Sequence, residues 1–165
     1  MNYSEVIQQK IVSGEALERK LSYWRFKNMK MVFTNGCFDI LHLGHIDYLA
    51  KAADLGDVLI VGLNTDDSVK RLKGNHRPLN DEHARAMVLA SLQFVHAVVL
   101  FDEDTPYNLI HQVQPIVLVK GNDYHAEEIV GFDILKQNNG EVITIELVEG
   151  YSTTILENKI KLSSI

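Results

Sequence analysis

Short, continuously apolar stretches alternate with segments of helical periodicity along most of this chain, and this alternation restricts the fold more than any other feature. The clearest stretch is residues 57–63, which ends in Val-Leu-Ile-Val-Gly-Leu. A strand that is apolar throughout is buried on both faces, as happens when helices cover both sides of a parallel sheet. The sequence therefore predicts an α/β fold with a doubly wound parallel sheet. Five strands are expected, at residues 30–34, 57–63, 97–101, 116–119 and 141–145.

Helical spacing of apolar residues fills the segments between the expected strands. Before the first strand, residues 4–26 also have helical character, with Gly14 as a break. A length of 165 residues suits one compact domain. We therefore expect an N-terminal helical segment, residues 1–27, followed by the sheet domain, residues 28–165. The helices of that domain are expected at residues 43–53, 65–72, 82–94, 105–113, 127–137 and 153–162.

The composition limits the classes of function. A net charge of -6 argues against a protein that binds duplex nucleic acid, because such proteins usually carry a basic excess. The single cysteine, Cys37, excludes an intramolecular disulfide and a multi-cysteine zinc site. No apolar run reaches the roughly 18–20 residues that cross a bilayer, and the first residues do not have the pattern of a signal peptide. These features predict a cytoplasmic enzyme or small-ligand binder.

A cluster of basic residues stands out in this acidic chain. Lys70, Arg71, Lys73, Arg77 and Arg85 account for five of the sixteen lysines and arginines within a tenth of the sequence. A local basic cluster suits a small anionic ligand such as a nucleotide phosphate. From spacing alone, a solvated loop with chance charges explains the cluster equally well.

Two histidines, His42 and His45, lie at the start of the helix expected after the first strand. A spacing of three places both side chains on one helix face. Gly44 between them removes a side chain where a ligand could approach closely. Free N–H groups at a helix N-terminus favour an anion. Two imidazoles in this position could donate hydrogen bonds to a phosphate whose charge grows in a transition state.

Three other interpretations of this segment stay open at this point. His42 and His45 could bind a metal ion, although no third ligand follows a recognisable pattern. They could instead be structural residues that cap the helix. Cys37 with a histidine partner could act as a hydrolytic nucleophile, but a lone cysteine is more often a small buried residue.

Residues 34–45, Thr-Asn-Gly-Cys-Phe-Asp-Ile-Leu-His-Leu-Gly-His, resemble the signature of the nucleotidyltransferase superfamily, whose hallmark is His-x-Gly-His after the first strand. The Gly-Cys-Phe-Asp stretch makes the chain similar to the cytidylyltransferase-like group, and within it to adenylyltransferases that make ADP-heptose. The resemblance implies a Rossmann-like, HUP-type nucleotidyltransferase domain over residues 28–165. Further similar segments are residues 61–66, 71–80, 101–106, 118–124 and 148–154.

The resemblance also implies a reaction. The expected activity is transfer of the AMP moiety of ATP to a sugar 1-phosphate, heptose 1-phosphate in particular, with release of pyrophosphate in lipopolysaccharide synthesis. Mg²⁺ is expected as the cofactor, bound through the phosphates rather than by the protein. The expected partners are a nucleoside triphosphate, a sugar phosphate and a second copy of the chain in a homodimer, without nucleic acid or membrane.

Two alternative functions remain open from the sequence. A cytidylyltransferase could use CTP with glycerol 3-phosphate or another alcohol phosphate, because fold and motif decide neither the base nor the acceptor. A nucleotide-binding regulatory module without turnover would share the fold, but the intact histidine pair argues against it.

The resemblance and the residue chemistry together assign the site. At the start of the last expected helix, Ser152, Thr153 and Thr154 could cap the helix, bind phosphates or do both. The superfamily often places an arginine in that helix, where Lys159 is the nearest cation here. The expected catalytic residues are His42, His45 and Lys73. The expected nucleotide and phosphate ligands are Thr34, Asn35, Gly36, Phe38, Gly44, Lys120, Gly121, Asp123, Ser152, Thr153 and Thr154. The expected acceptor ligands are Asp39, Asn64, Asp66, Arg71, Arg77 and Arg85.

Overall fold

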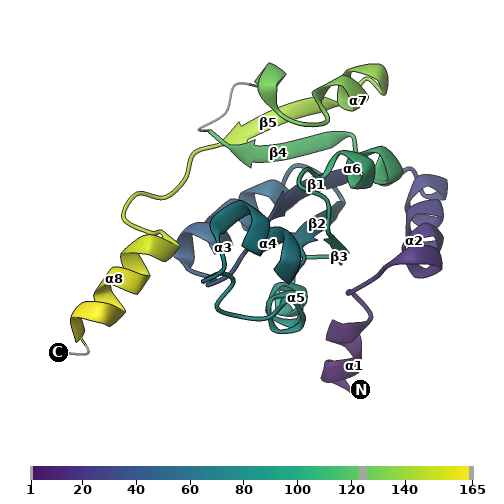
Figure 1. The fold of residues 1–165 in the computed structure, drawn as a ribbon. Coiled ribbons are helices and arrows are strands. Elements are labelled where there is room, and N and C mark those ends of the chain that lie inside the picture. The colour runs from purple at the N-terminus through teal and green to yellow at the C-terminus, as the bar shows by residue number, and fades with distance from the viewer. Residues whose placement is uncertain (1, 123–125, 164–165) are drawn as a thin grey trace.

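A computed structural model, which describes residues 2–122 and 126–163, contains a five-stranded parallel sheet with helices on both sides (Figure 1). The strand order is β3-β2-β1-β4-β5, and every adjacent pair is parallel. The predicted doubly wound parallel sheet is therefore confirmed. The strands are β1 (Met31–Gly36), β2 (Val58–Asn64), β3 (Ala97–Phe101), β4 (Val117–Gly121) and β5 (Glu141–Ile145).

The interior strand β2 shows why continuous apolar runs produce this fold. Every residue of β2 is buried. Val58 and Ile60 pack into one hydrophobic core, whereas Leu59 and Val61 pack into a second core. Successive side chains of a strand point to opposite faces, so both faces must be covered. The edge strand β5 departs from this pattern, with only Ile145 buried.

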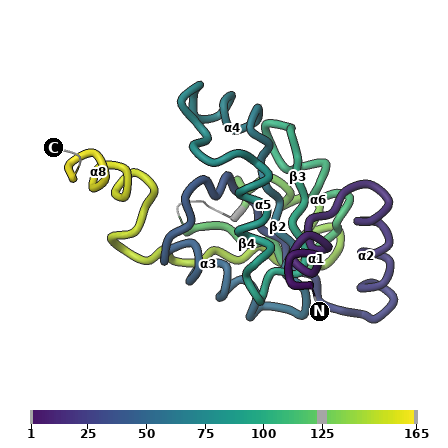
Figure 2. The backbone as a smooth tube through the Cα atoms, turned by 90° about the horizontal axis from the view of Figure 1, so that it is seen from below, coloured from purple at the N-terminus to yellow at the C-terminus, as the bar shows by residue number. Residues whose placement is uncertain are grey.

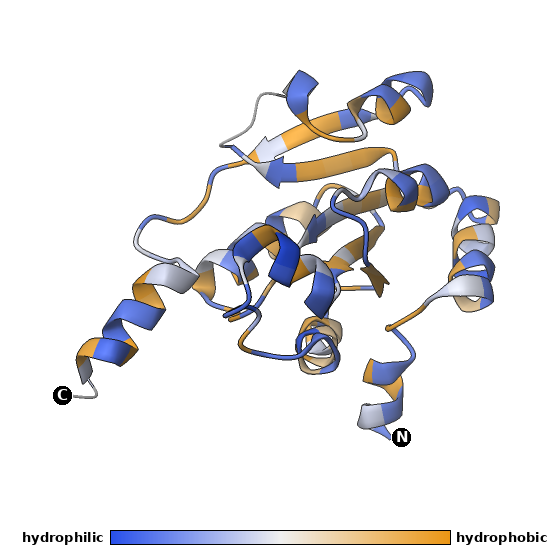
Figure 3. Cartoon of the chain, in the orientation of Figure 1, coloured by the Kyte–Doolittle hydropathy of each residue, from blue (hydrophilic) through white to orange (hydrophobic). Residues whose placement is uncertain are grey.

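The helices divide between the two cores. The first core receives side chains from α2 (Gly14–Phe26), α6 (Tyr107–Val113) and α7 (Phe132–Gln137). The second receives side chains from α3 (Leu43–Ala53) and α5 (Glu82–Ser91). In Figure 3 the apolar colouring is most continuous on the strands, and most hydrophilic residues lie on helices and loops.

The helix expected over residues 105–113 begins two residues later, at Tyr107, and two other predicted helices are shorter for a backbone reason. The helix expected over residues 127–137 is split into a 3-10 turn, Ala126–Glu128, and α7, because Gly131 between them has a left-handed φ of 94°. The helix expected over residues 82–94 ends at Ser91, since Leu92 takes an extended conformation.

The N-terminal segment packs on the same core as the sheet. It contains α1 (Tyr3–Gln8) and α2, and Ile11 between them forms a parallel bridge with Val98 of β3. Leu17 and Leu21 of α2 are fully buried in the first core. The boundary between residues 27 and 28 stays a prediction, and the segment before it contributes to the packing of the sheet.

The carboxyl ends of the strands lead into the elements that form the candidate site. The loop after β1 enters α3, and β2 leads into α4 (Asp66–Lys73). After β5 the chain reaches α8 (Thr153–Ser163), which has no buried residue and extends away from the body (Figure 2). In the part of the chain that the structure describes, none of the helices combines the length and apolarity needed to cross a membrane.

Candidate active site

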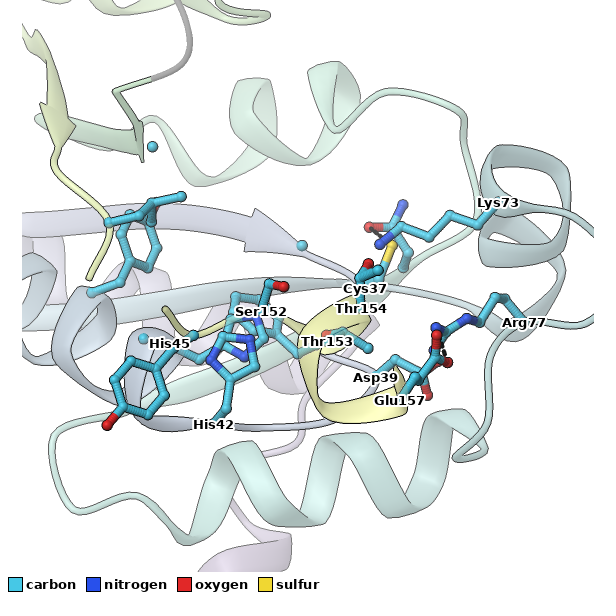
Figure 4. Close-up of a pocket in the computed structure, with 18 of the residues that line it drawn as sticks. Cys37, Asp39, His42, His45, Lys73, Arg77, Ser152, Thr153, Thr154 and Glu157 are labelled. Atoms are coloured by element: carbon cyan, nitrogen blue, oxygen red, sulfur yellow. Dashed lines mark hydrogen bonds and ion pairs between the residues drawn. The ribbon is translucent and has the colours of Figure 1, made fainter. Parts of the chain in front are cut away.

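A cavity of about 770 Å³ opens at the carboxyl edge of the sheet (Figure 4). Its walls come from the loop after β1, the start of α3, the end of α4 and its following loop, the end of β4 and the first turns of α8. The structure thus brings together segments that are far apart in sequence. The predicted site residues that line the cavity are Asn35, Gly36, Phe38, Asp39, His42, Gly44, His45, Asn64, Lys73, Arg77, Lys120, Gly121, Ser152, Thr153 and Thr154.

The two histidines form a stacked pair at the N-terminus of α3. Their ring centroids lie 3.8 Å apart, with an angle of 25° between the planes. His42 is the N-cap residue of α3, and Phe38 packs its ring edge against His45 with centroids 5.3 Å apart. A Cβ atom on Gly44 would lie 3.1 Å from His42 Nδ1. Glycine therefore leaves room for the His42 ring itself at this position.

Both imidazoles are neutral near pH 7. Burial, with help from the nearby His42 and Lys73, lowers the pKa of His45 to about 4, although a hydrogen bond to the Ile40 backbone opposes this shift. Burial also lowers the pKa of His42. A neutral imidazole carries one N–H donor and no charge. The histidines are therefore suited to donate hydrogen bonds, and the positive charge at the cavity comes from lysine and arginine.

We expect the His45 resonances of the ligand-free protein to titrate with a midpoint near pH 4 in an NMR experiment. Because folding lowers this pKa below the ordinary value of 6.5, the folded state binds fewer protons than the unfolded chain between these values. The contribution of His45 to stability is therefore present above pH 6.5 and is lost as the pH falls toward 4. A His45→Gln variant identifies the resonance and removes this part of the pH dependence. A midpoint near 6.5 would contradict the buried, neutral imidazole.

Lys73 and Lys120 line the cavity and come from two different elements, α4 and β4. Lys73 is the last residue of α4, and Lys120 lies near the end of β4. The Nζ atom of Lys120 donates to Asn35 Oδ1 at 2.5 Å. Ammonium groups from two elements therefore face a cavity whose other donors include the Arg77 guanidinium, helix N-termini and imidazoles, a combination that suits a polyphosphate.

Asp39 organises the loop after α4. Its carboxylate accepts hydrogen bonds from the backbone N–H groups of Leu79 and Asn80, at 2.8 and 2.9 Å, and from Arg77 Nη1 at 2.7 Å. Burial by itself would raise the pKa of this carboxyl, but these bonds hold the pKa below its usual value. Asp39 therefore holds the loop and Arg77 in place, with its oxygens already engaged by the protein.

The first turn of α8 closes one side of the cavity. Ser152 Oγ accepts a hydrogen bond from Ile155 N at 3.1 Å, so the capping role considered for this residue is present. Ser152, Thr153 and Thr154 all line the cavity. Capping and phosphate binding use different atoms of these residues, because the hydroxyl hydrogens remain able to donate.

Four predicted site residues lie away from the cavity: Thr34, Asp66, Arg71 and Arg85. Thr34 is fully buried, and its hydroxyl contacts Tyr48 Oη at 2.7 Å and the Val119 carbonyl at 3.0 Å. A nucleotide contact by its side chain is therefore not available in this structure. Asp123, also predicted, lies outside the described residues.

Arg71 and Arg85 have structural partners in place of the predicted acceptor contacts. Exposed Arg71 forms ion pairs with Asp102 and Asp104 after β3. Arg85 is fully buried and donates to the carbonyls of Cys37, Asn64 and Asn80 at 2.7, 2.8 and 3.0 Å. Arg85 also donates to Asp66 Oδ1 at 2.8 Å, so the Asp66 carboxylate has a partner within the protein as well. Of the basic cluster, Lys73 and Arg77 therefore line the cavity, whereas Arg71 and Arg85 lie away from it.

Cys37 lines the cavity without the properties of a nucleophile. Burial raises the pKa of its thiol, and Lys73 and Arg85 oppose that shift only in part. Its Sγ atom lies 3.8 Å from Asn64 Oδ1, its hydrogen-bond acceptor. The thiol therefore stays protonated, and the hydrolytic interpretation has no support in the geometry.

Sequence reasoning missed several residues that line the cavity, of which Glu157 has the clearest role. Its carboxylate pairs with Arg77 Nη2, which links α8 to the loop after α4. Helical spacing offered a signal, because Glu157 follows Thr153 by four residues and Thr154 by three, and so shares their helix face. The other missed lining residues are Tyr48, His76, Leu147 and Tyr151.

The cavity does not offer a metal site made by protein ligands alone. Across residues 2–122 and 126–163, no group of three His, Cys, Asp or Glu side chains is placed to hold a metal ion. The cavity carboxylates of Asp39 and Glu157 both pair with Arg77. A Mg²⁺ ion at this cavity would therefore take its ligands mainly from triphosphate oxygens.

Comparison with known proteins agrees with the geometry. Proteins called "Bifunctional protein HldE" from Wolinella succinogenes and Campylobacter concisus are 52% and 57% identical over 93% of this chain. The chain spans about a third of the length of these curated relatives, 32% and 31%.

Two solved structures share the fold. A lipopolysaccharide core biosynthesis protein from Thermoplasma volcanium has a TM-score of 0.58 and 29% identity, over 75% of this chain and 99% of its own. A pantoate-beta-alanine ligase from Francisella tularensis has a TM-score of 0.57 at 17% identity, over 94% of this chain and 78% of its own, which shows likeness of fold alone.

The family model described as cytidylyltransferase-like matches residues 33–159, which include both histidines and the first turn of α8. The chain belongs to the cytidylyltransferase-like family of nucleotidyltransferases.

Proposed function

We propose that this chain transfers the AMP moiety of ATP to a sugar 1-phosphate, heptose 1-phosphate in particular, and releases pyrophosphate. The observation that carries the proposal is the stacked, neutral pair of His42 and His45 at a helix N-terminus, with Lys73 lining the same cavity. The choice of heptose 1-phosphate rests on the resemblance of residues 34–154 to ADP-heptose-forming enzymes and on the 52% and 57% identity to the HldE proteins.

The chemistry requires positioning and charge stabilisation. An oxygen of the acceptor phosphate attacks the α-phosphorus of ATP, and the bond between that phosphorus and the bridging oxygen of pyrophosphate breaks. The substrate phosphate is already a nucleophile, so no covalent enzyme intermediate is needed. His42 and His45 would donate N–H groups to the α-phosphate, and Lys73 would neutralise the charge that develops there.

The remaining phosphates have donors in α8. Ser152, Thr153 and Thr154 would hold the β- and γ-phosphates through their hydroxyls and the N-terminal amides of the helix. Mg²⁺ on the triphosphate would supply further charge neutralisation.

The proposal includes a cytoplasmic location and a homodimer. The relatives do not favour the alternative of a CTP-dependent enzyme that acts on glycerol 3-phosphate.

A pyrophosphate-release assay tests this function. We expect release from ATP and Mg²⁺ with heptose 1-phosphate, and little with other sugar 1-phosphates. The same assay with CTP and glycerol 3-phosphate is the matched comparison. Release with that pair alone would replace the proposed function by the alternative, and the absence of release with every combination would favour a regulatory module.

A further inference from the structure

The carboxylate of Glu157 is unexpected in a cavity built for phosphates. It lines the cavity together with Lys73 and Lys120, and its side chain is 22% exposed. A carboxylate repels phosphate groups that come close to it. Arg77 offsets part of this repulsion, so the ligand group that contacts the carboxylate itself is favoured to be an uncharged donor or a cation.

The two carboxylates of the cavity differ in what they can still bind. Asp39 is only 6% exposed and accepts two backbone N–H groups in addition to Arg77. Glu157 uses one oxygen, Oε1, for Arg77. Among residues 2–122 and 126–163, its second oxygen, Oε2, has no hydrogen-bond donor. A carboxylate oxygen can accept more than one hydrogen bond, so Glu157 retains capacity for hydroxyl donors of a ligand.

Glu157 lies one helical turn beyond Thr153 and Thr154, so it borders the proposed phosphate site on the side away from the histidines. In Figure 4, Asp39, Arg77 and Glu157 gather at one end of the cavity, and His42, His45 and Ser152 lie toward the other. Phosphates are favoured at the histidine end, where neutral N–H donors and helix N-termini meet. The carboxylate of Glu157, one turn beyond the last proposed phosphate ligand of α8, is therefore left for an uncharged group that carries hydroxyls.

We propose that Glu157 is a specificity-determining residue that accepts hydrogen bonds from hydroxyl groups of the acceptor sugar. Arg77 holds the carboxylate in place, and Asp39 in turn anchors Arg77. The inference rests on the proposed function, because it assigns one end of that same cavity to the acceptor. Ribose hydroxyls of ATP share this chemistry, so the test must separate the two sources.

The test is a Glu157→Gln variant with steady-state kinetics for both substrates. We expect the KM for heptose 1-phosphate to rise about tenfold, because hydrogen bonds to a charged carboxylate are replaced by weaker ones to a neutral amide, or by none where the NH₂ group faces the sugar. The KM for ATP should stay within about twofold, because Asp39 still holds Arg77 and no triphosphate donor has changed. Asn158→Ala, an exposed neighbour on α8 that does not line the cavity, is the matched control and should leave both KM values unchanged.

Other outcomes overturn the inference. A rise in the KM for ATP in place of the acceptor would mean that Glu157 contacts ribose or only positions α8. An unchanged KM for the acceptor, in a protein that turns over normally, would remove the contact and leave the proposed function intact. Absence of turnover by the wild-type protein on every sugar 1-phosphate would overturn the proposed function and the inference with it.

Monodeoxy acceptors refine the result. If Glu157 accepts from a particular hydroxyl, an acceptor that lacks this hydroxyl should have the same KM with the wild-type protein and with Glu157→Gln. If the tenfold difference between the two proteins persists with every deoxy acceptor, the direct contact is excluded.

Discussion

Replacement of His45 by alanine lowers kcat by about 10²- to 10³-fold in the pyrophosphate-release assay, as expected for loss of one preorganised donor to a phosphate that gains charge. The KM for ATP changes much less, because the interaction strengthens in the transition state. The ring is only partly buried and packs against His42 and Phe38 at the start of α3, so the fold persists.

Two further variants make the His45 result specific. His45→Gln keeps an N–H donor in the side chain and should retain more activity than His45→Ala. His83→Ala changes an exposed histidine on α5 outside the cavity and should leave kcat unchanged. Turnover of His45→Ala within about threefold of wild type would remove the catalytic role, since even one lost donor is expected to cost far more.

Replacement of Arg85 by leucine destabilises the protein by about 3 kcal/mol or more, because it leaves buried acceptors without a donor. The side chain is fully buried and bonds to the carbonyls of Cys37, Asn64 and Asn80 and to Asp66. For a domain of this size, the loss corresponds to a fall in Tm on the order of 10 °C in calorimetry.

Arg71→Leu is the matched control for Arg85→Leu. It removes a guanidinium from the same basic cluster, but one that pairs with Asp102 and Asp104 at the surface, so Tm should change little. A normal Tm for Arg85→Leu together with a raised KM for either substrate would restore the substrate-binding role that the sequence predicted. A lowered Tm with unchanged KM values at low temperature supports the structural role.

Much of the fold was predictable from local sequence. Residues 58–63 are apolar at every position, so any fold that buries them must cover both faces of the strand. The histidine pair was predictable for the same local reason. His42 and His45 are three residues apart at a helix start, and the structure stacks their rings.

The roles of individual charged residues were not predictable in this way. Arg71, Lys73, Arg77 and Arg85 look alike in sequence, and their partners lie far along the chain. Arg85 reaches Cys37, 48 residues away, and Arg77 reaches Glu157, 80 residues away. A long cationic side chain pairs with whatever acceptors the packing brings to it, so only the folded chain decides which cation faces a ligand.

The sequence by itself determined the parallel sheet, the edge at which the cavity opens and the histidine pair, because each depends on residues that are neighbours on one strand or one helix turn. Only the tertiary structure decided the roles of Arg85, Thr34 and Glu157. Arg85 joins buried carbonyls of separate segments by hydrogen bonds, Thr34 bonds to Tyr48 and the Val119 carbonyl, and Glu157 lines the cavity. These roles depend on contacts between segments that the backbone brings together only on folding, and burial there sets both the charge state and the available partners of each group.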